Sequence, residues 1–408
     1  MEYVIIGNST AGIAAAESIR KLDQAGSITI LSDEAFPTYG RPLISYYLLG
    51  KTDAAHMNYR PADFYRKNNI RTMFSVRAEH IDAAKKQVLL QGGKKVKYDK
   101  LLVATGSRPF VPPMEGLDKN EYFTFMTYAD ALALEKQLAP EKKVLIVGAG
   151  LIGLKCLEGI ADRVGKVTVV DMAPHILPSI LDDYGASIIQ KQLEKHGAEF
   201  YLSDSVASFE KGVVHLKSGA TVPFDILVVA AGVRPNVELV KEAGGKVGRG
   251  ILTDDRQETS LKDVYAAGDC TESYDITCGQ SRILALLPNA QFQGSCAGTN
   301  MAGGEAHFTN AVPMNAIGFF GSHVLTAGSY FGDTYEEKEG ETYKKLFFDG
   351  DKLNGFILID LPERAGIYTS LLRNQTSLSE VDFEALKKDP GLLAFSEAFR
   401  EQKLARKV

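Results

Sequence analysis

One stretch, Lys143–Asp171, limits what this chain can fold into more than any other part of the sequence. It begins with an apolar run of strand length, Val144–Val147, which leads into Gly148-Ala149-Gly150-Leu151-Ile152-Gly153. A helical pattern follows, and then a second apolar run, Val167–Val170, which Asp171 closes. This order of strand, glycine turn, helix, strand and acid predicts a unit that binds a dinucleotide.

Each glycine of this pattern has a physical task. Gly148 allows a sharp turn, Gly150 lets a pyrophosphate approach the backbone, and Gly153 lets the helix lie close to its strand. The first N–H groups of the helix, at Leu151-Ile152, then face the phosphates. Asp171 can accept hydrogen bonds from a ribose 2′-hydroxyl and would repel a 2′-phosphate, so the pattern favours NAD over NADP. A glycine pattern alone would also fit an ordinary tight turn.

A second unit of the same kind opens the chain. An apolar strand leads into Gly7-Asn8-Ser9-Thr10-Ala11-Gly12, and an alanine-rich helix and the strand Ile28–Leu31 follow. Ser9 stands where a second glycine is usual, and its small side chain still admits a phosphate. We expect Asp33 to contact the ribose, with Glu34 as the alternative if the strand runs one residue longer. The alternative is that both acids are ordinary loop residues with no role in binding.

Three further segments follow in a fixed order. Leu101–Pro109 is a buried strand that breaks at a glycine turn, and Asp225–Asn236 is a near copy of it. Val264–Cys270 comes next and contains a Gly-Asp pair. Two dinucleotide units in one chain suggest two bound dinucleotides, usually FAD and NAD(P)H.

Together these five motifs resemble the two-dinucleotide flavoprotein reductases, the pyridine nucleotide-disulfide oxidoreductase superfamily, over nearly the whole chain. The resemblance implies an α/β fold with two Rossmann-like dinucleotide-binding domains, as in glutathione reductase, and a C-terminal α+β interface domain. It also implies FAD at the first glycine turn, NAD(H) at the second, and a hydrogen bond from Asp269 to the FAD ribityl chain. The segment Pro288–Gly294 is similar to one that opens a helix under the flavin ring, where N–H groups stabilise negative charge. An ordinary turn and a simple helix cap are the alternatives at these two places.

The residues that we expect to bind the two cofactors come from these motifs. They are Gly7, Ser9, Thr10, Ala11, Gly12, Asp33, Glu34, Arg41, Pro42, Ala104, Thr105, Gly106, Gly148, Gly150, Leu151, Ile152, Gly153, Asp171, Gly232, Gly268, Asp269, Pro288 and Gln293.

The chemistry of the superfamily depends on cysteines near the flavin. Disulfide reductases carry a C-x4-C pair after the first ribose acid, and NADH oxidases, peroxidases and coenzyme A disulfide reductases carry one cysteine there. Here the segment Tyr39–Tyr47 has no cysteine, and the first in the chain is Cys156. The pattern Y-x-R-P-x-x-S is instead similar to NADH-dependent rubredoxin and ferredoxin reductases and to the amino-terminal module of NADH nitrite reductases.

One position pair departs from these relatives. They often have a lysine directly after the serine and a glutamate two residues after the last NAD-site glycine, which pair near flavin N5. Here these positions are Tyr46 and Lys155. We hypothesise that Lys155 supplies the cation while Tyr46 packs nearby, with Pro42 in the same catalytic group. The alternative is that Lys155 faces solvent on its helix.

Cysteine usage gives no metal site. Cys156, Cys270, Cys278 and Cys296 form neither a C-x-x-C pair nor a cluster of familiar metal spacing, so free structural thiols are expected. The sequence leaves open the alternative that Cys270 and Cys278 come together in the folded chain. An iron centre that exchanges electrons with this chain is therefore expected in a separate protein.

Composition and charge narrow the class of protein further. A formal charge of −5, spread along the chain, gives no argument for nucleic acid. We expect a cytoplasmic protein with no membrane span and no signal peptide, because apolar runs of spanning length are absent and the first residues already read as a strand. In the relatives the C-terminal domain takes part in dimerisation or carrier docking, so a homodimer stays open.

Three domains are expected. Residues 1–110 and 243–310 form a discontinuous FAD-binding domain, 111–242 the NAD-binding domain, and 311–408 the interface domain. In the last, alternating apolar residues predict antiparallel strands over Val324–Tyr330, Tyr343–Phe348 and Leu353–Leu358, with a hairpin at Asp349-Gly350. An amphipathic helix is expected over Asp382–Arg406.

The function that the resemblance implies is electron transfer between NADH and a separate iron–sulfur or rubredoxin-type carrier. Hydride passes from NADH to flavin N5, and single electrons then pass to the carrier without a catalytic cysteine. Two alternatives stay open, a flavin NADH oxidase that reduces oxygen directly and a non-catalytic redox-sensing flavoprotein.

Overall fold

The computed structural model describes residues 1–397, 399 and 400, which form two compact units. The first unit contains Met1–Pro174, His196–Ser273 and Ser281–Thr309. The second contains His175–Lys195, Tyr274–Gln280 and the chain from Asn310 onward. The three expected domains, with their boundaries, stay a prediction.

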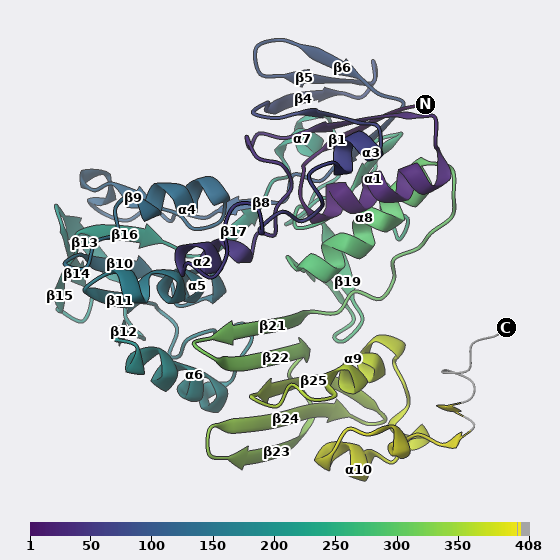
Figure 1. The fold of residues 1–408 in the computed structure, drawn as a ribbon. Helices are drawn as coiled ribbons and strands as arrows, with labels where there is room; N and C mark the ends of the chain where they lie inside the picture. Colours follow the sequence, from purple (N-terminus) through teal and green to yellow (C-terminus); the bar gives the residue numbers. More distant parts are fainter. Residues whose placement is uncertain (398, 401–408) are drawn as a thin grey trace. The chain divides into compact units, whose positions relative to one another are not determined.

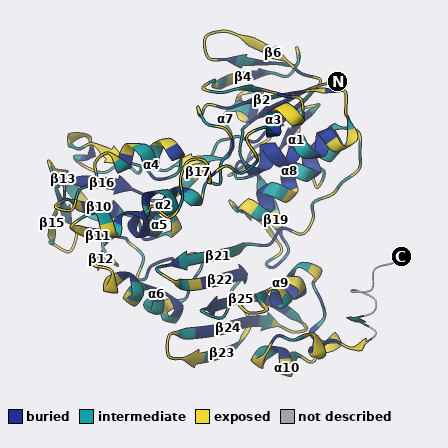
Figure 2. Ribbon diagram, viewed as in Figure 1, coloured by how far each residue is buried: buried dark blue, intermediate teal, exposed yellow. Residues whose placement is uncertain are grey.

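Two five-stranded sheets form the centre of the first unit (Figure 1), and all their neighbouring strands run parallel. The apolar runs of the sequence become most of their strands, and these runs are largely dark blue in Figure 2 because both sheet faces are covered there. The first sheet has the order β18 (Val264–Ala266), β7 (Lys100–Val103), β1 (Glu2–Ile6), β2 (Ser27–Leu31), β3 (Ile70–Met73). The second has the order β9 (Tyr122–Phe123), β16 (Ile226–Val229), β10 (Lys143–Val147), β11 (Lys166–Val170), β12 (Ala198–Tyr201).

Helices connect these strands. Those of the first unit are α1 (Thr10–Leu22), α2 (Leu43–Leu48), α3 (Phe64–Lys67), α4 (Tyr128–Glu135), α5 (Leu151–Ile160), α7 (Glu238–Glu242) and α8 (Leu287–Met301), with 3-10 turns at Leu117–Lys119 and Ala161–Arg163. Figure 1 shows α1 and α8 side by side. Glycines permit this contact, because a Cβ at Gly294 would lie 2.2 Å from the Ala11 carbonyl oxygen, and one at Gly298 would lie 2.4 Å from that of Ala15.

Smaller antiparallel sheets complete the first unit. Two of these sheets have three strands each. The first is β4 (Ala78–Asp82), β5 (Gln87–Leu90) and β6 (Lys95–Lys97), and the second is β13 (Val206–Glu210), β14 (Val213–Leu216) and β15 (Thr221–Pro223). A two-stranded ribbon pairs β8 (Ser107–Pro109) with β17 (Val233–Pro235). A separate two-stranded sheet is formed by β19 (Glu272–Asp275) and β20 (Gln280–Ile283), whose residues are divided between the two units.

The second unit is built on an antiparallel sheet. Its order is β21 (Met314–Phe319), β22 (Ser322–Gly328), β25 (Lys352–Ile359), β24 (Thr342–Asp349), β23 (Asp333–Glu339). The sequence predicted β22, β24, β25 and the hairpin turn, but not β21 or β23. In β23 four of the seven residues are Asp or Glu, which hides the apolar alternation. The helices are α6 (Asp183–Lys195), α9 (Ala365–Asn374) and α10 (Phe383–Lys388), with 3-10 turns at Leu378–Glu380 and Leu392–Ala394.

Helix α6 belongs to this unit through buried polar contacts just before it. The Asp182 carboxylate accepts a hydrogen bond from the Tyr343 hydroxyl at 2.7 Å and pairs with the Lys345 ammonium at 3.0 Å. Lys345 also pairs with Glu336 at 2.6 Å. A chain segment that lies in sequence between β11 and β12 of the second parallel sheet is thus part of the second unit.

The prediction of a helix over Asp382–Arg406 is wrong in part. The helix α10 ends at Lys388, because Asp389 precedes Pro390, and proline disfavours a helical conformation at the residue before it. The rest of the expected helix includes Ala398 and 401–406, which lie outside the described residues. Within the described chain, no helix combines the length and the apolar character that a membrane span requires.

Candidate active site

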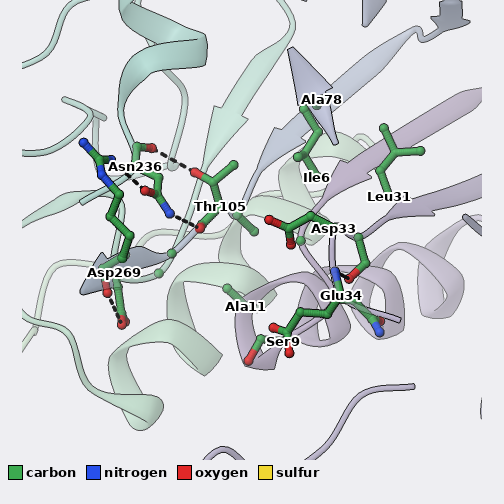
Figure 3. Close-up of a pocket in the computed structure, with 18 of the residues that line it drawn as sticks. Ile6, Ser9, Ala11, Leu31, Asp33, Glu34, Ala78, Thr105, Asn236 and Asp269 are labelled. Carbon is green, nitrogen blue, oxygen red and sulfur yellow. Dashed lines mark hydrogen bonds between the residues drawn. The ribbon is translucent and has the colours of Figure 1, made fainter. Parts of the chain in front are cut away.

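A cavity of about 1000 Å³ opens at the carboxyl ends of the first parallel sheet. Figure 3 shows Ser9 and Ala11 at its base, Asp33 and Glu34 on one side, and Thr105, Asn236 and Asp269 on the other. Ligands bind at this edge of parallel α/β sheets because the strand ends and helix amino termini meet there. The cavity is lined by residues from segments that are far apart in the sequence, which suits an extended ligand such as a dinucleotide.

The glycine turn has the geometry that the sequence predicted. Gly7 has φ +123°, and a Cβ there would lie 2.0 Å from the Ala104 carbonyl oxygen. A Cβ at Gly12 would lie 2.1 Å from the Gly7 carbonyl oxygen, so Gly12 lies behind the turn and brings α1 close to it. Ser9 is the N-cap of α1 with no side-chain capping bond. The first N–H groups of α1 therefore point toward the cavity, where they can bind a phosphate.

Arg41 brings a positive charge to this turn. Its Nε donates to the Ser9 hydroxyl at 3.4 Å, its Nη1 donates to the Met126 carbonyl at 3.3 Å, and its Nη2 forms an ion pair with Glu34. The Glu34 carboxylate also accepts from the Tyr39 hydroxyl at 2.7 Å. The ion pair with Glu34 and the bond to the Met126 carbonyl hold the guanidinium in place, so it can face a pyrophosphate with little loss of side-chain entropy on binding.

The two candidate ribose acids differ in their surroundings. The strand β2 ends at Leu31, so the condition that would favour Glu34 is not met. Glu34 is engaged by Arg41 and Tyr39, whereas Asp33 is exposed and lines the cavity. This arrangement supports Asp33 as the ribose contact, which stays a prediction.

The opposite wall contains a buried acid. Asp269 accepts from the Ser107 hydroxyl at 3.4 Å. Burial raises the pKa of the Asp269 carboxyl above its usual value, while Arg41 and Ser107 oppose that shift. Behind it, the buried Gln293 side chain accepts from the Gly268 N–H at 2.9 Å and so holds the Gly-Asp turn. Asp269 therefore faces the cavity in a fixed position, ready to accept a ligand hydroxyl.

The second glycine turn repeats the first. Gly148 has φ +120°, a Cβ there would lie 2.3 Å from the Ala230 carbonyl oxygen, and one at Gly153 would lie 2.0 Å from the Gly148 carbonyl oxygen. Nothing lies within 4 Å of a Cβ at Gly150, which leaves open space in front of α5. Asp171 accepts from the Ala149 N–H at 2.6 Å and from the Ala173 N–H at 2.8 Å, which fixes its carboxylate beside the turn.

The structure brings Lys155 and Tyr46 together where α2 packs on α5. The Lys155 ammonium lies 4.9 Å from the centre of the Tyr46 ring and forms an ion pair with Glu158, one turn further along α5. The exposed fraction of the Lys155 side chain is 15% and that of Glu158 is 4%, so Lys155 does not simply face solvent. Sequence analysis did not select Glu158, although its i+3 spacing from Lys155 on a helix was a usable signal.

The four cysteines are free and lie elsewhere. None of them is among the described residues that line the cavity. Burial raises the pKa of the Cys270 thiol to about 11 and that of Cys296 to about 11, and it also raises the pKa of Cys156. Cys278 is half-buried, and no Cys270–Cys278 disulfide forms. Nucleophilic thiolates are therefore disfavoured at the three buried positions.

The pyridine nucleotide-disulphide oxidoreductase family profile matches residues 1–294. The chain belongs to this family. The family binds FAD and NAD(H), so these are the cofactors of the chain, and it is an NAD(H)-dependent oxidoreductase. The resemblance found in the sequence is thereby confirmed, and so is the α/β fold with two Rossmann-like units.

The relatives of this chain carry names that describe different activities. The chain is 30% identical over 393 residues to the NADH-dependent phenylglyoxylate dehydrogenase subunit epsilon of Aromatoleum evansii, covering 93% of each chain. It is 35% identical over 320 residues to an NADH oxidase of Methanocaldococcus jannaschii, covering 76% of this chain and 71% of the relative. It spans about half, 49%, of the assimilatory nitrate reductase electron transfer subunit of Bacillus subtilis, at 32% identity.

Solved structures share the fold over the whole chain. The complex of putidaredoxin reductase with putidaredoxin aligns with a TM-score of 0.88 at 22% identity, covering 99% of each chain. NADH:rubredoxin oxidoreductase of Clostridium acetobutylicum aligns with a TM-score of 0.76 at 26% identity, covering 93% of this chain and 94% of that protein.

The expected cofactor residues fall into two groups around the two turns. Those that line the cavity are Gly7, Ser9, Thr10, Ala11, Asp33, Glu34, Arg41, Ala104, Thr105, Gly106, Gly268 and Asp269. Gly12 and Gln293 support this wall from behind, Pro42 precedes α2, and Pro288 is in the first turn of α8. Those at the second turn are Gly148, Gly150, Leu151, Ile152, Gly153, Asp171 and Gly232. Their individual roles stay predictions.

Sequence analysis missed part of the cavity wall. Thr105 donates to the Asn236 carbonyl at 2.9 Å, and the Asn236 amide donates to the Thr105 carbonyl at 2.8 Å (Figure 3). Arg108 and Asn236 both line the cavity, although Asn236 follows the NAD-side sheet in sequence. The repeated Arg-Pro of the two near-copy segments was the signal that pointed to them.

Proposed function

We propose that this chain passes electrons between NADH and a separate iron–sulfur or rubredoxin-type carrier protein, with FAD and without a catalytic cysteine. The observation that carries this proposal is that the segment from Arg41 into α2 enters the cofactor region with no thiol. A member of the family that lacks this thiol cannot store electrons on sulfur beside the flavin. The acceptor must therefore take electrons from the flavin itself.

The residues of the cavity fit FAD. Only glycine fits at position 7, because an added Cβ would collide with the Ala104 carbonyl oxygen. The turn at Gly7 lets a pyrophosphate approach the N–H groups of α1. Arg41 would offset the negative charge of the pyrophosphate. Asp33 would accept a hydrogen bond from a hydroxyl of the adenosine ribose, and Asp269 would accept one from a hydroxyl of the ribityl chain. When bound, the flavin supplies two-electron exchange with NADH and one-electron exchange with a carrier.

The second turn binds NADH in the same way. The open space at Gly150 admits the pyrophosphate to the start of α5. Asp171 accepts from the adenosine ribose and repels a 2′-phosphate, which favours NADH. The chain contributes to rate chiefly by placing the nicotinamide against the flavin, because orientation converts the hydride transfer into an intramolecular step.

Lys155 acts at the junction of the two sites. The Tyr46 ring and the Glu158 carboxylate hold its ammonium in a largely buried position. A fixed cation near the flavin favours negative charge on the reduced ring, so it raises the flavin potential. Lys155→Met should lower the flavin potential and slow reduction by NADH about tenfold, whereas Lys51→Met, an exposed lysine just after α2, should change neither. An unchanged potential together with an unchanged rate would remove this role.

Anaerobic rapid mixing tests the whole proposal. The FAD-loaded protein is mixed with NADH, and the reduced protein is then mixed with ferredoxin, rubredoxin or oxygen. We expect fast flavin reduction and faster reoxidation by one of the carriers than by oxygen. Slow reduction by NADH would favour a redox-sensing flavoprotein and would contradict the proposal.

An NADH oxidase is the second candidate. The relative with 35% identity that carries this name supports it. Fast oxygen consumption without an added carrier would establish it instead of carrier reduction. The titratable thiol that cysteine-dependent oxidation requires is disfavoured here by the burial of Cys156, Cys270 and Cys296.

A further inference from the structure

The ribbon of β8 and β17 joins two copies of one sequence pattern. Arg108 pairs with Arg234 across the ribbon. The Asn236 N–H donates to the Gly106 carbonyl at 2.9 Å, and the Phe110 N–H donates to the Gly232 carbonyl at 2.8 Å. The backbone of the ribbon is therefore close to symmetric, with each strand making the same bonds to the other.

The glycine turns fix which residues correspond. Gly7 meets the Ala104 carbonyl as Gly148 meets the Ala230 carbonyl. Counting onward from these two alanines, Arg108 corresponds to Arg234. In the same way Phe110 corresponds to Asn236.

Each arginine reaches across to the corresponding residue of the other strand. The Arg108 Nη1 donates to the Asn236 side-chain oxygen at 2.8 Å. The Arg234 guanidinium lies 4.2 Å from the centre of the Phe110 ring. Arg108 and Asn236 line the cavity at the first glycine turn, and the symmetry of the ribbon relates Arg234 and Phe110 to the corresponding side of the second turn. Nothing lies within 4 Å of a Cβ at Gly150 or at Gly232, so there is open space at the second turn.

The charges of the two arginines differ. The Arg108 guanidinium forms a two-bond ion pair with Glu238, at 2.7 and 3.2 Å. The residue that corresponds to Glu238 is Pro112, which carries no charge. Among the described residues no carboxylate lies within 4 Å of the Arg234 guanidinium, and Arg234 is exposed. The positive charge on the NAD side is thus available to a ligand.

We propose that Arg234, held against the Phe110 ring, binds the pyrophosphate of NAD(H). This inference rests on the proposed binding of NADH at the second glycine turn. The formal negative charge of NADH lies on its two phosphates, so an uncompensated guanidinium on this side of the second turn acts on that part of the ligand. Stacking on Phe110 restricts the arginine before the ligand arrives, which reduces the entropy cost of binding.

Equilibrium binding to the FAD-loaded protein tests this. Arg234→Gln should weaken NADH binding about tenfold and reduce its dependence on salt, and Arg234→Lys should restore part of the affinity. ADP-ribose keeps the pyrophosphate but lacks the nicotinamide, so its affinity should fall by a similar factor. Lys217→Gln removes one positive charge from an exposed position directly after β14, in the antiparallel sheet of the same unit, and should leave both affinities unchanged.

The outcomes separate this inference from the proposed function. Normal NADH affinity in Arg234→Gln would overturn the inference while leaving the proposed function intact. A loss for NADH without a loss for ADP-ribose would place the arginine at the nicotinamide and would also overturn it. If the wild-type flavin is not reduced by NADH, the proposed function fails, and ADP-ribose binding still tests Arg234.

Discussion

The two glycine units of this protein share one backbone and differ in their side chains. In the first, the Gly7 N–H donates to the Leu31 carbonyl at 2.9 Å, and in the second the Gly148 N–H donates to the Val170 carbonyl at 2.9 Å. The first strands are anchored alike, since Asp99 accepts from the Glu2 N–H at 2.7 Å. In the second unit Asp225 accepts from the Lys143 N–H at 2.8 Å. Turn geometry is thus common to both units.

The differences lie where a ligand would be. The first turn has Ser9, bonded to Arg41, and the second has Gly150 with open space around it. Strand register puts Ser32 at the position of Asp171, so the acid of the first unit comes one residue later. The comparison teaches that glycines give both turns the same backbone, and we expect the side chains beside each turn to decide which dinucleotide it binds.

The largest expected effects come from the glycines that close the turns. Gly12→Ala should abolish FAD retention, because the added Cβ would lie 2.1 Å from the Gly7 carbonyl oxygen and α1 would have to move away. Gly153→Ala should leave FAD bound and weaken NADH binding about a hundredfold. Flavin absorbance and NADH titration measure the two effects. Gly366→Ala, at a helical position with nothing within 4 Å, is the matched control. Loss of FAD in Gly153→Ala would show that the units are not independent.

Replacing the acid that follows each glycine unit, Asp171 or Asp33, should give the next largest effects on nucleotide binding. Asp171→Ala removes the carboxylate that accepts from Ala149 and Ala173, and it should raise the KM for NADH more than tenfold while changing the KM for NADPH little. Asp33→Ala should instead weaken FAD binding about tenfold. Steady-state kinetics with both nucleotides and fluorescence titration of FAD measure these changes. An unchanged FAD affinity in Asp33→Ala would transfer the ribose contact to Glu34.

The outer strands of the two sheets differ in their response to pH. Asp263, just before β18, pairs with Lys100 at 2.7 Å and Lys86 at 2.6 Å, which lower its pKa to about 2. Because this pKa is below the unfolded value of about 4, the pairs stabilise the fold above pH 4, and their contribution is lost as the pH falls toward 2. Asp263→Asn, which suits the left-handed backbone there, should cost about 1 kcal/mol of unfolding free energy at pH 7.

Denaturant unfolding at several pH values checks this prediction. The difference between wild type and Asp263→Asn should shrink below pH 4. A difference that stays constant down to pH 3 would rule out the carboxylate charge as its cause. The counterpart strand, β9, has only two residues and lacks such a pair among the described residues, so Glu121→Gln should cause no comparable change.

The smallest effects should come from exchanging the second position of each turn. Gly150→Ser adopts the extended backbone of that N-cap without strain, and its hydroxyl enters open space, so the KM for NADH should rise about threefold. Ser9→Gly removes only a long hydrogen bond to Arg41 and should change FAD affinity less than threefold. A large loss in either exchange would show that this position, and not the closing glycines, decides affinity.

Local pattern predicted most of the scaffold. The strand ends at Leu31 and Val170, the turns at Gly7 and Gly148, and the helices after them occur where the sequence indicated. These features depend on neighbours in sequence, since only glycine tolerates the positive φ of both turns. The absence of a cysteine before Cys156 likewise needed no structure.

Contacts between distant segments were not predictable in this way. The reciprocal bonds of Thr105 and Asn236 join segments that are 131 residues apart in the sequence. Helix α6 joins the second unit through Asp182 and Lys345, which local periodicity does not record. The expected helix past Lys388 failed because Asp389-Pro390 interrupts an amphipathic pattern that is otherwise continuous.

By itself the sequence determined that this chain has two glycine turns of the dinucleotide-binding kind, an acid after the second strand of each unit, and no cysteine in Tyr39–Tyr47. Each of these follows from residue identity at short spacing. Only the tertiary structure decided that Glu158 pairs with Lys155 beside Tyr46, and that Arg108 has a carboxylate partner whereas Arg234 has none among the described residues. Electrostatic partners are chosen by distance in space, and the fold alone brings such residues within a few ångströms of one another.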